Sequence, residues 1–262
     1  MILEHLIDPA SQHALLWTAL LLALRITPLF LLSPWLTLGN LPWMIRASLA
    51  FGFLLALFPL ATSQGLLNPP TALELPLIVL REFGIGLLFA IASAVPFWAM
   101  GWAGQLSHHW QGFSFSDNSS GGLQKLFFYF AIALFASMGG LRFAVDRFAQ
   151  TLLDVPLAGV GPSNVHLQAL ALGSSRLVAD ALWFTLLFAT PVAATLVLSD
   201  LSMGWINRIS PQFSAFFLSV PLKTALSIFA IMISLAVFGQ HALDIFQTAV
   251  VSAKTLILEF AR

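Results

Sequence analysis

The stretch NRISPQFSAFFLSVPLKTAL, residues 207–226, places two prolines and two cations between two of the most apolar segments of the chain. Ser210 is a favoured residue just before a helix, and Pro211 is tolerated at the first helical position, where its missing N–H had no partner. The phenylalanines that follow recur at three- and four-residue spacing, which places them on one helix face. Pro221 breaks this face and Lys223 follows, so the sequence predicts two half-helices that meet at a buried, cation-bearing kink.

The composition around this stretch is that of a membrane protein. Of 262 residues, 59% are hydrophobic and 8% charged, against about 45–50% and about 25% in soluble domains. The 11 cationic and 11 acidic side chains cancel, so no basic field favours nucleic acid. The absence of cysteine excludes disulfides and thiolate sites. Glu4 and Asp8 stand where a secretory signal would be positive, so the first apolar run is expected to be retained.

Six apolar segments approach the length of about 20 residues that a helix needs to cross a bilayer core. Several of them contain proline or a cation, and backbone groups released by proline must find partners in protein or water. We therefore predict an all-α integral membrane protein, a single domain over residues 1–262, with helical segments broken by proline and buried mainly against other protein. The six segments are 14–38, 47–61, 83–102, 126–141, 181–198 and 215–238.

Arg25 lies within the first apolar segment, where an ionised side chain is costly unless it meets a carboxylate, carbonyls or water. Asp180, at the start of the fifth segment, is a candidate partner, as are Glu82 and Asp200. Two interpretations stay open. The arginine belongs either to an ion or substrate pathway, or to a structural ion pair or subunit contact, which is the commoner case.

Arg81 and Glu82 precede the segment FGIGLLFA, residues 83–90. We interpret them as a charge pair at a helix start. Gly84 and Gly86 would then let another backbone approach closely.

The polar interruption at residues 104–122, GQLSHHWQGFSFSDNSSGG, is rich in Gly and Ser and carries Trp110, Phe113 and Phe115. Such a loop can plug a pore or lie at the membrane interface as part of an aromatic belt. His108 and His109 are adjacent and so point in different directions, unlike the i, i+4 pair of a zinc helix.

Enzyme signatures are missing elsewhere: the chain has no HExxH, no phosphate-binding GxxxxGK[ST] and no GxSxG. We therefore predict no catalytic residues, no cofactor and no metal site. An intramembrane hydrolase using His108 or His109 is disfavoured on the same grounds.

The order of several motifs resembles that of the FliR/SctT family, the export-gate proteins of flagellar and injectisome type III secretion. Residues 200–223, DLSMGWINRISPQFSAFFLSVPLK, match a turn, Arg, Pro-Gln and apolar-helix pattern. Residues 81–106 are similar to the family's Arg-Glu-plus-glycine helix and Ala-Gly-Gln turn, and residues 137–159 to a further segment. In the first stretch the matching residues are Arg208, Pro211, Gln212, Phe216 and Pro221.

This resemblance implies a non-enzymatic, multi-pass subunit of the bacterial inner membrane, within the secretion-system basal body. It implies helical hairpins in a spiral assembly with FliP/SctR-like and FliQ/SctS-like subunits, close to an FlhB/SctU-like switch protein. The assembly would be the closed entrance of a channel for unfolded proteins. Lys223 after Pro221, without an FlhB-like extension, favours the injectisome branch.

The resemblance also assigns roles to two groups of residues. The loop after the third segment resembles the family's plug, which makes Trp110, Gly112, Phe113 and Phe115 candidates for gating. A secondary transporter or channel using Arg25 and Asp180 is the alternative function. The candidates for the helix joint and partner contact are Arg208, Pro211, Gln212, Phe216, Pro221 and Lys223.

Overall fold

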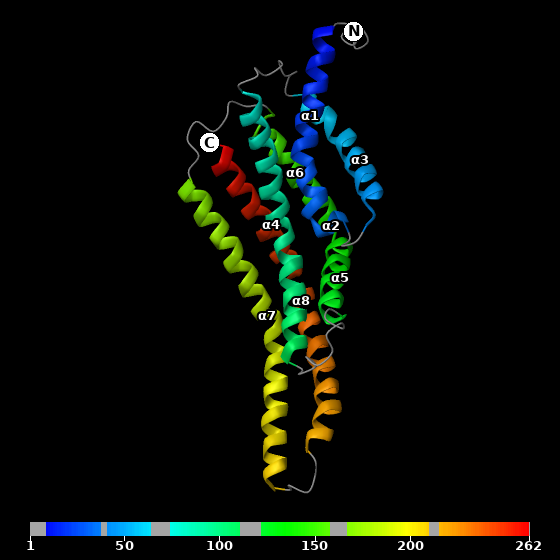
Figure 1. The fold of residues 1–262 in the computed structure, drawn as a ribbon, viewed down its shortest axis with the longest axis vertical. Helices are drawn as coiled ribbons and strands as arrows, with labels where there is room; N and C mark the ends of the chain where they lie inside the picture. Colours follow the sequence, from blue (N-terminus) through cyan, green and yellow to red (C-terminus); the bar gives the residue numbers. More distant parts are fainter. Residues whose placement is uncertain are drawn as a thin grey trace. The chain divides into compact units, whose positions relative to one another are not determined.

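The computed structural model describes residues 9–37, 41–63, 74–110, 122–157, 167–209 and 215–261, and the regular structure within these ranges is helical (Figure 1). The helices are α1 Pro9–Leu32, α2 Pro34–Thr37, α3 Trp43–Thr62, α4 Leu75–Trp110, α5 Gly122–Ser137, α6 Gly140–Asp154, α7 Leu167–Ile209 and α8 Ala215–Ala261.

The predicted all-α membrane fold is confirmed, and each of the six apolar segments contributes to a helix. Among the described residues, α1, α3, α4 and α7 are long and apolar enough to cross a membrane. The pair α5 and α6, bent by 76° at the break between them, makes a fifth span if the two helices count as one. In α8 the described apolar piece is shorter, Ala225–Ala236.

Proline interrupts these helices less than we predicted. At Pro34 the chain does break, because α2 begins there after Ser33 leaves the helix. The two half-helices expected at Pro221 belong to one element, since α8 continues through that position, whose side chain lies outside the described part. A kink at this proline stays a prediction. A helix can continue past proline because only one backbone hydrogen bond of the helix is lost, and neighbouring groups can bind the carbonyl that is left without its donor. The same holds at Pro28, Pro59, Pro96 and Pro191.

The contacts of the chain divide into two compact units. The first comprises residues 1–95, 139–177 and 246–262, and the second comprises 96–138 and 178–245. The long helices α4, α7 and α8 each contribute to both units.

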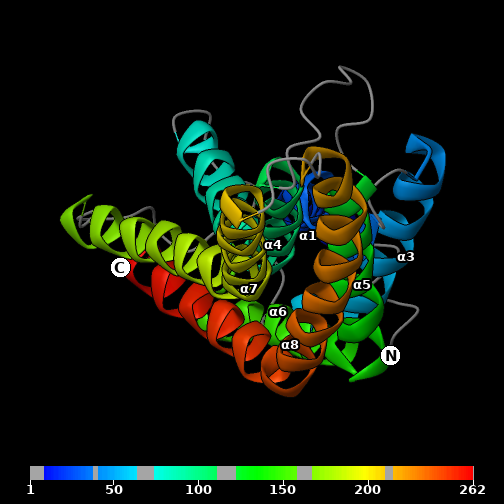
Figure 2. The ribbon, with the colours of Figure 1, turned by 90° about the horizontal axis from the view of Figure 1, so that it is seen from below.

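An aromatic chain forms the centre of the first unit and joins four helices. Phe30 of α1 meets Phe53 of α3 with ring centroids 5.8 Å apart, and Phe53 meets Phe148 of α6 at 5.8 Å. Phe148 in turn meets Phe89 of α4 edge-on at 5.2 Å. In the same unit, the first turns of α7 and the last turns of α8 lie side by side in both views, and Gly173 faces Leu256 there (Figures 1 and 2).

The second unit contains two antiparallel helix pairs, as the prediction of hairpins requires. In the pair of α7 and α8, Lys223 is 2.5 Å from Asp200, and Ser234 donates a hydrogen bond to the carbonyl of Phe188 at 2.6 Å. Phe188 also packs edge-on against Phe238 at 4.7 Å.

The second of these pairs consists of the last part of α4 and α5. Phe97 meets Phe135 at 5.3 Å, and a Cβ at Gly104 would lie 2.6 Å from the Leu123 carbonyl oxygen. Glycine at 104 therefore lets α5 approach the α4 backbone closely.

Candidate functional site

The most unusual site in the described chain is a buried cluster of three charges in the first unit. Arg25 on α1 and Glu82 on α4 are both fully buried. The Arg25 Nε and Nη2 atoms lie 2.6 and 2.5 Å from the Oε2 atom of Glu82. Arg81 Nη1 lies 3.2 Å from the other carboxylate oxygen, Oε1. One carboxylate therefore serves two arginines, and the cluster carries a net charge of +1.

The remaining charge is met by the C-terminal end of α6. Arg25 Nη1 donates to the carbonyl of Val155 at 2.9 Å and to that of Thr151 at 3.4 Å. Arg81 Nη1 lies 3.4 Å from the carbonyl of Pro156. The last carbonyls of a helix lack partners within it and form the negative end of its dipole, so cations are favourable there. Arg25 thus acts as a C-terminal cap of α6 and binds it to α1 and α4.

The sequence of α4 presents this site on one face. Glu82, Ile85, Gly86 and Phe89 follow one another at the spacing of a single helix face, and all four are buried. A Cβ at Gly86 would overlap the carbonyl oxygen of Arg25, so α1 and α4 touch through their backbones at this point. The close approach predicted from the glycines is confirmed at Gly86.

At Gly84 the neighbour is a side chain instead of a backbone. A Cβ there would lie 2.9 Å from the tip of the Phe260 ring on α8. The tip of a side chain can shift more easily than a main-chain carbonyl, so this contact constrains the helices less.

The prediction that Arg81 and Glu82 stand at the start of a helix is wrong. α4 begins at Leu75, so Arg81 and Glu82 lie well inside the helix, and both are buried. Both charges are accommodated inside the helix because they contact each other and Glu82 also contacts Arg25.

Of the three partners considered for Arg25, the structure shows Glu82. Asp200 is paired with Lys223 within the second unit, and Asp180 is a half-exposed residue of α7. The cluster has the features of a structural clamp, because cations on α1 and α4 are held by a carboxylate of α4 and by main-chain carbonyls at the end of α6. A pathway built on Arg25 and Asp180 gains no support from these contacts.

The residues of the predicted plug lie mostly outside the described part. Trp110 is the last residue of α4 and is 40% exposed. Gly112, Phe113 and Phe115 fall within residues 111–121, of which the structure describes nothing. The gating role of this loop stays a prediction. Within the described ranges, no three His, Asp or Glu side chains gather as metal ligands would.

The predicted helix joint is described in part. Arg208 lies exposed in the last turn of α7, where a cation complements the helix dipole. Lys223 bridges to Asp200 on the neighbouring helix. Pro211 and Gln212 lie outside the described residues, as do the side chains of Phe216 and Pro221. The joint's contact with a partner stays a prediction.

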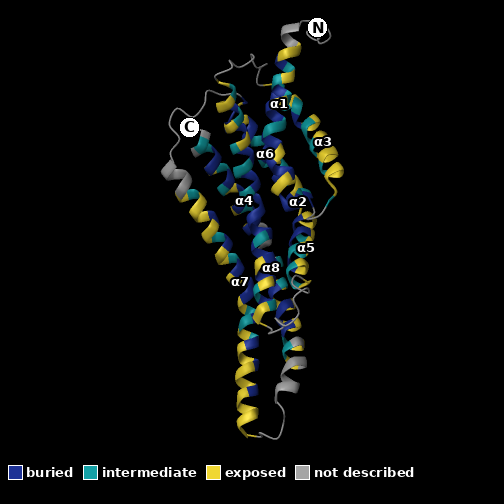
Figure 3. Cartoon of the chain, in the orientation of Figure 1, coloured by how far each residue is buried: buried dark blue, intermediate teal, exposed yellow. Residues whose placement is uncertain are grey.

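The part of α7 that belongs to the second unit is largely exposed (Figure 3), and many of its exposed residues are large and apolar. Trp205 is 75% and Ile209 79% exposed. Contiguous apolar surface of this kind marks contact with lipid or with other protein. The exposed large apolar residues of this stretch also include Leu182, Trp183, Leu186, Val197, Leu198 and Leu201.

Comparison with known proteins finds a match to the model of the bacterial export proteins, family 1, over residues 16–249. The chain is 26% identical over 219 residues to the surface presentation of antigens protein SpaR of Shigella sonnei, covering 80% of this chain and 81% of that protein. It is 30% identical over 183 residues to the secretion system apparatus protein SsaT of Salmonella typhimurium, covering 63% and 66%. The flagellar biosynthetic protein FliR of Escherichia coli is 23% identical over 248 residues, covering 90% and 93%.

Proposed function

The chain belongs to the bacterial export proteins, family 1, and from this membership we propose that it is a non-enzymatic subunit of a type III export gate. The observation that carries the proposal is the family match, which extends over residues 16–249. The subunit lies in the bacterial inner membrane within the basal body of the secretion system. With FliP/SctR-like and FliQ/SctS-like subunits it forms the closed entrance of the protein channel, beside an FlhB/SctU-like protein.

The distribution of polar and apolar side chains supports this proposal. The buried charges of Arg25 and Arg81 in the first unit are met internally, by Glu82 and by carbonyls at the end of α6. The apolar surface that remains open, such as that around Trp205, suits helices of partner subunits as well as lipid. A protein built in this way assembles through apolar surfaces and keeps its charged cluster as an internal clamp.

We further propose that the chain serves an injectisome, with a flagellar system as the alternative. The identities of 26% to SpaR and 30% to SsaT exceed the 23% to the flagellar protein of Escherichia coli. SpaR is named for the surface presentation of antigens, and SsaT for a secretion system. We therefore propose that the cargo of this chain's assembly consists of secreted, unfolded proteins.

Co-expression with its FliP-like and FliQ-like neighbours tests the function. After gentle detergent extraction, native mass spectrometry is expected to give one discrete mixed complex that contains this chain. A stable homo-oligomer that ignores both partners would contradict the proposal. Substrate-dependent flux through that homo-oligomer would support a transporter in its place.

For the plug, we expect that replacing Phe113 and Phe115 together by Ala raises leakage of small solutes through the assembled gate. Aromatic side chains fill a pore that alanine leaves open. Leakage is measured as dye efflux from vesicles that carry the complex. The matched control is Phe51→Ala, because Phe51 is an aromatic residue of α3 that is 62% exposed and is not part of the loop. Equal leakage from the loop variant and the control would contradict the gating role of this loop.

For the helix joint, we expect Pro221→Leu to reduce co-purification with the partner subunits several-fold. Leucine restores the helix hydrogen bond that proline removes, and so changes the direction of the helix before residue 221. The amount of partner recovered per mole of tagged chain is the measurement. Pro59→Leu, at an exposed proline within α3, is the control and should leave recovery unchanged. Normal recovery with Pro221→Leu would show that the joint does not depend on this proline.

A further inference from the structure

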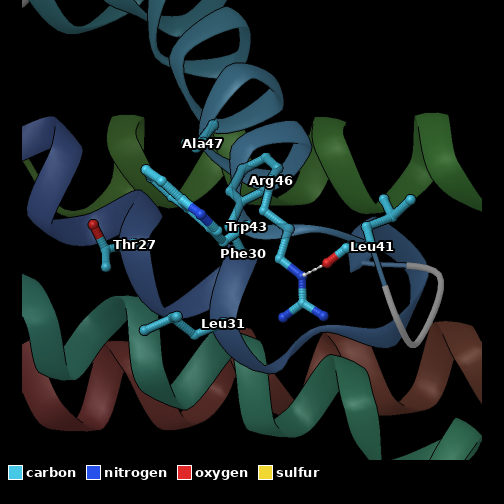
Figure 4. A pocket seen from close by; sticks show the side chains of 8 residues that line it. Thr27, Phe30, Leu31, Leu41, Trp43, Arg46 and Ala47 are labelled. Carbon is cyan, nitrogen blue, oxygen red and sulfur yellow. Dashed lines mark hydrogen bonds between the residues drawn. The ribbon is translucent and has the colours of Figure 1, made fainter.

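A pocket of about 350 Å³ lies in the first unit, between α1 and the start of α3 (Figure 4). Apart from Thr27 and Arg46 its walls are apolar. Phe30 and Leu31 come from α1, Leu41 from the segment before α3, and Ala47 and Ala50 from α3. A space of this size and character suits part of an acyl chain, because apolar walls favour apolar ligands.

One cation, Arg46, stands in this apolar wall. Its Nε donates to the carbonyl of Leu41 at 2.9 Å, which holds the guanidinium in place with its two terminal nitrogens directed away from that carbonyl (Figure 4). Across the described ranges, no carboxylate lies within ion-pair distance of Arg46, and neither terminal nitrogen has a hydrogen-bond partner. The planar fork of such a guanidinium matches the oxygens of a phosphate group.

The position of the pocket along the chain agrees with a lipid ligand. α3 is one of the helices that are long and apolar enough to span a membrane, and this span begins at Trp43. Trp43 lines the pocket and is 73% exposed. Tryptophan and arginine at the end of a span lie at the depth of the lipid head groups. The pocket therefore opens where a phosphate and an acyl chain are both present.

We propose that this pocket binds an anionic phospholipid. The acyl chain lies against Phe30, Leu31 and Ala50, and the head-group phosphate accepts hydrogen bonds from the terminal nitrogens of Arg46. A soluble anion would leave the apolar walls without a ligand. A zwitterionic lipid carries its own cation beside the phosphate and so gains less from Arg46. The inference needs only that the chain is in a membrane, and does not depend on the export role.

Titration of the purified full-length chain with lipid tests the proposal, with native mass spectrometry as the readout. Phosphatidylglycerol is expected to bind roughly tenfold more tightly than phosphatidylcholine with the same acyl chains. Arg46→Gln should remove that preference, and Arg46→Lys should keep only part of it, because lysine has the charge without the fork. The matched control is Arg176→Gln, since Arg176 is an exposed arginine near the start of another span, Leu172–Ile209.

A second variant tests the acyl site separately from the charge. Ala50→Phe fills the pocket and leaves Arg46 in place, so we expect weaker binding of both lipids. Thermal unfolding of each variant without lipid verifies that it is folded. Inorganic phosphate is titrated alongside and is expected to give no stabilisation.

Several results would overturn the proposal. Equal losses of phosphatidylglycerol binding in Arg46→Gln and Arg176→Gln would mean a diffuse charge effect. Stabilisation by inorganic phosphate alone would mean a site for a free anion. If neither pocket variant changed lipid binding but Ala50→Phe reduced recovery of co-expressed export subunits, the pocket would hold a protein segment.

Discussion

Glu82→Gln is expected to lower the free energy of unfolding by about 3–5 kcal/mol, the usual cost of removing one partner from a buried ion pair. The amide keeps the shape of the side chain but removes the carboxylate charge that Arg25 and Arg81 share in the described contacts. Arg25 and Arg81 would then stand as two buried cations close to the same point. The carbonyls at the end of α6 balance only part of that charge.

Arg25→Met is expected to lower the free energy of unfolding by less than Glu82→Gln does. This order of the two effects is a sharper test than either effect alone. After Arg25→Met, Glu82 keeps Arg81 as a partner, so a neutral pair remains. The loss is then the contact with Glu82 and the cap on the carbonyls of Thr151 and Val155. If the cluster were a conducting pathway instead of a clamp, the two substitutions would alter flux and leave the free energy of unfolding nearly unchanged.

The measurement is denaturant unfolding of the purified chain in a mild detergent, with each variant compared at the same detergent concentration. Arg142→Gln is the matched control. Arg142 pairs with Asp146 on α6 at 3.8 Å, but their side chains are 89% and 62% exposed, and an exposed pair contributes at most about 1 kcal/mol. A control variant as unstable as Glu82→Gln would mean that burial of the cluster is not what stabilises the first unit.

Gly86→Ala is the second large effect, expected to destabilise the protein by about 3 kcal/mol, at the upper end of the cost of overpacking. The added methyl group would overlap the carbonyl oxygen of Arg25. Because that oxygen belongs to the backbone of α1, no change of rotamer can relieve the overlap. The helices would have to separate, and separation would also lengthen the contact between Arg25 and Glu82.

Other glycines of the chain provide the comparison. At Gly52 and Gly204 nothing lies within 4 Å of an added Cβ, so alanine there is expected to stabilise the helix by roughly 0.5–1 kcal/mol. Gly84→Ala should fall between these and Gly86→Ala, because the Phe260 ring can move. Thermal unfolding of all four variants gives the ranking. Equal effects at Gly86 and Gly52 would refute the backbone contact between α1 and α4.

The hydrophobic pattern was sufficient to predict the class of fold. Long apolar runs with few charges have no stable alternative to helices in a membrane, so the helical state of the six segments could be predicted, though not their bounds. The close backbone contact at Gly86 could also be predicted from the sequence, because a glycine within an apolar helix indicates the close approach of another backbone. By contrast, α6 was missed as an element. It buries one face, including Ala144 and Phe148, but carries polar residues on the other, so it does not appear as an apolar run.

What the tertiary structure alone decided is which groups meet. Glu82 was one of three acidic residues that the sequence offered to Arg25, and nothing in their spacing chose between them. The other partners of Arg25 are the carbonyls of Thr151 and Val155, and every residue has a carbonyl, so side-chain identity carries no signal for them. The same holds for the helices that continue past their prolines, because whether a lost hydrogen bond is tolerated depends on the neighbouring groups. Hydrophobicity is a property of each segment, whereas charge pairing and capping depend on the distances between segments.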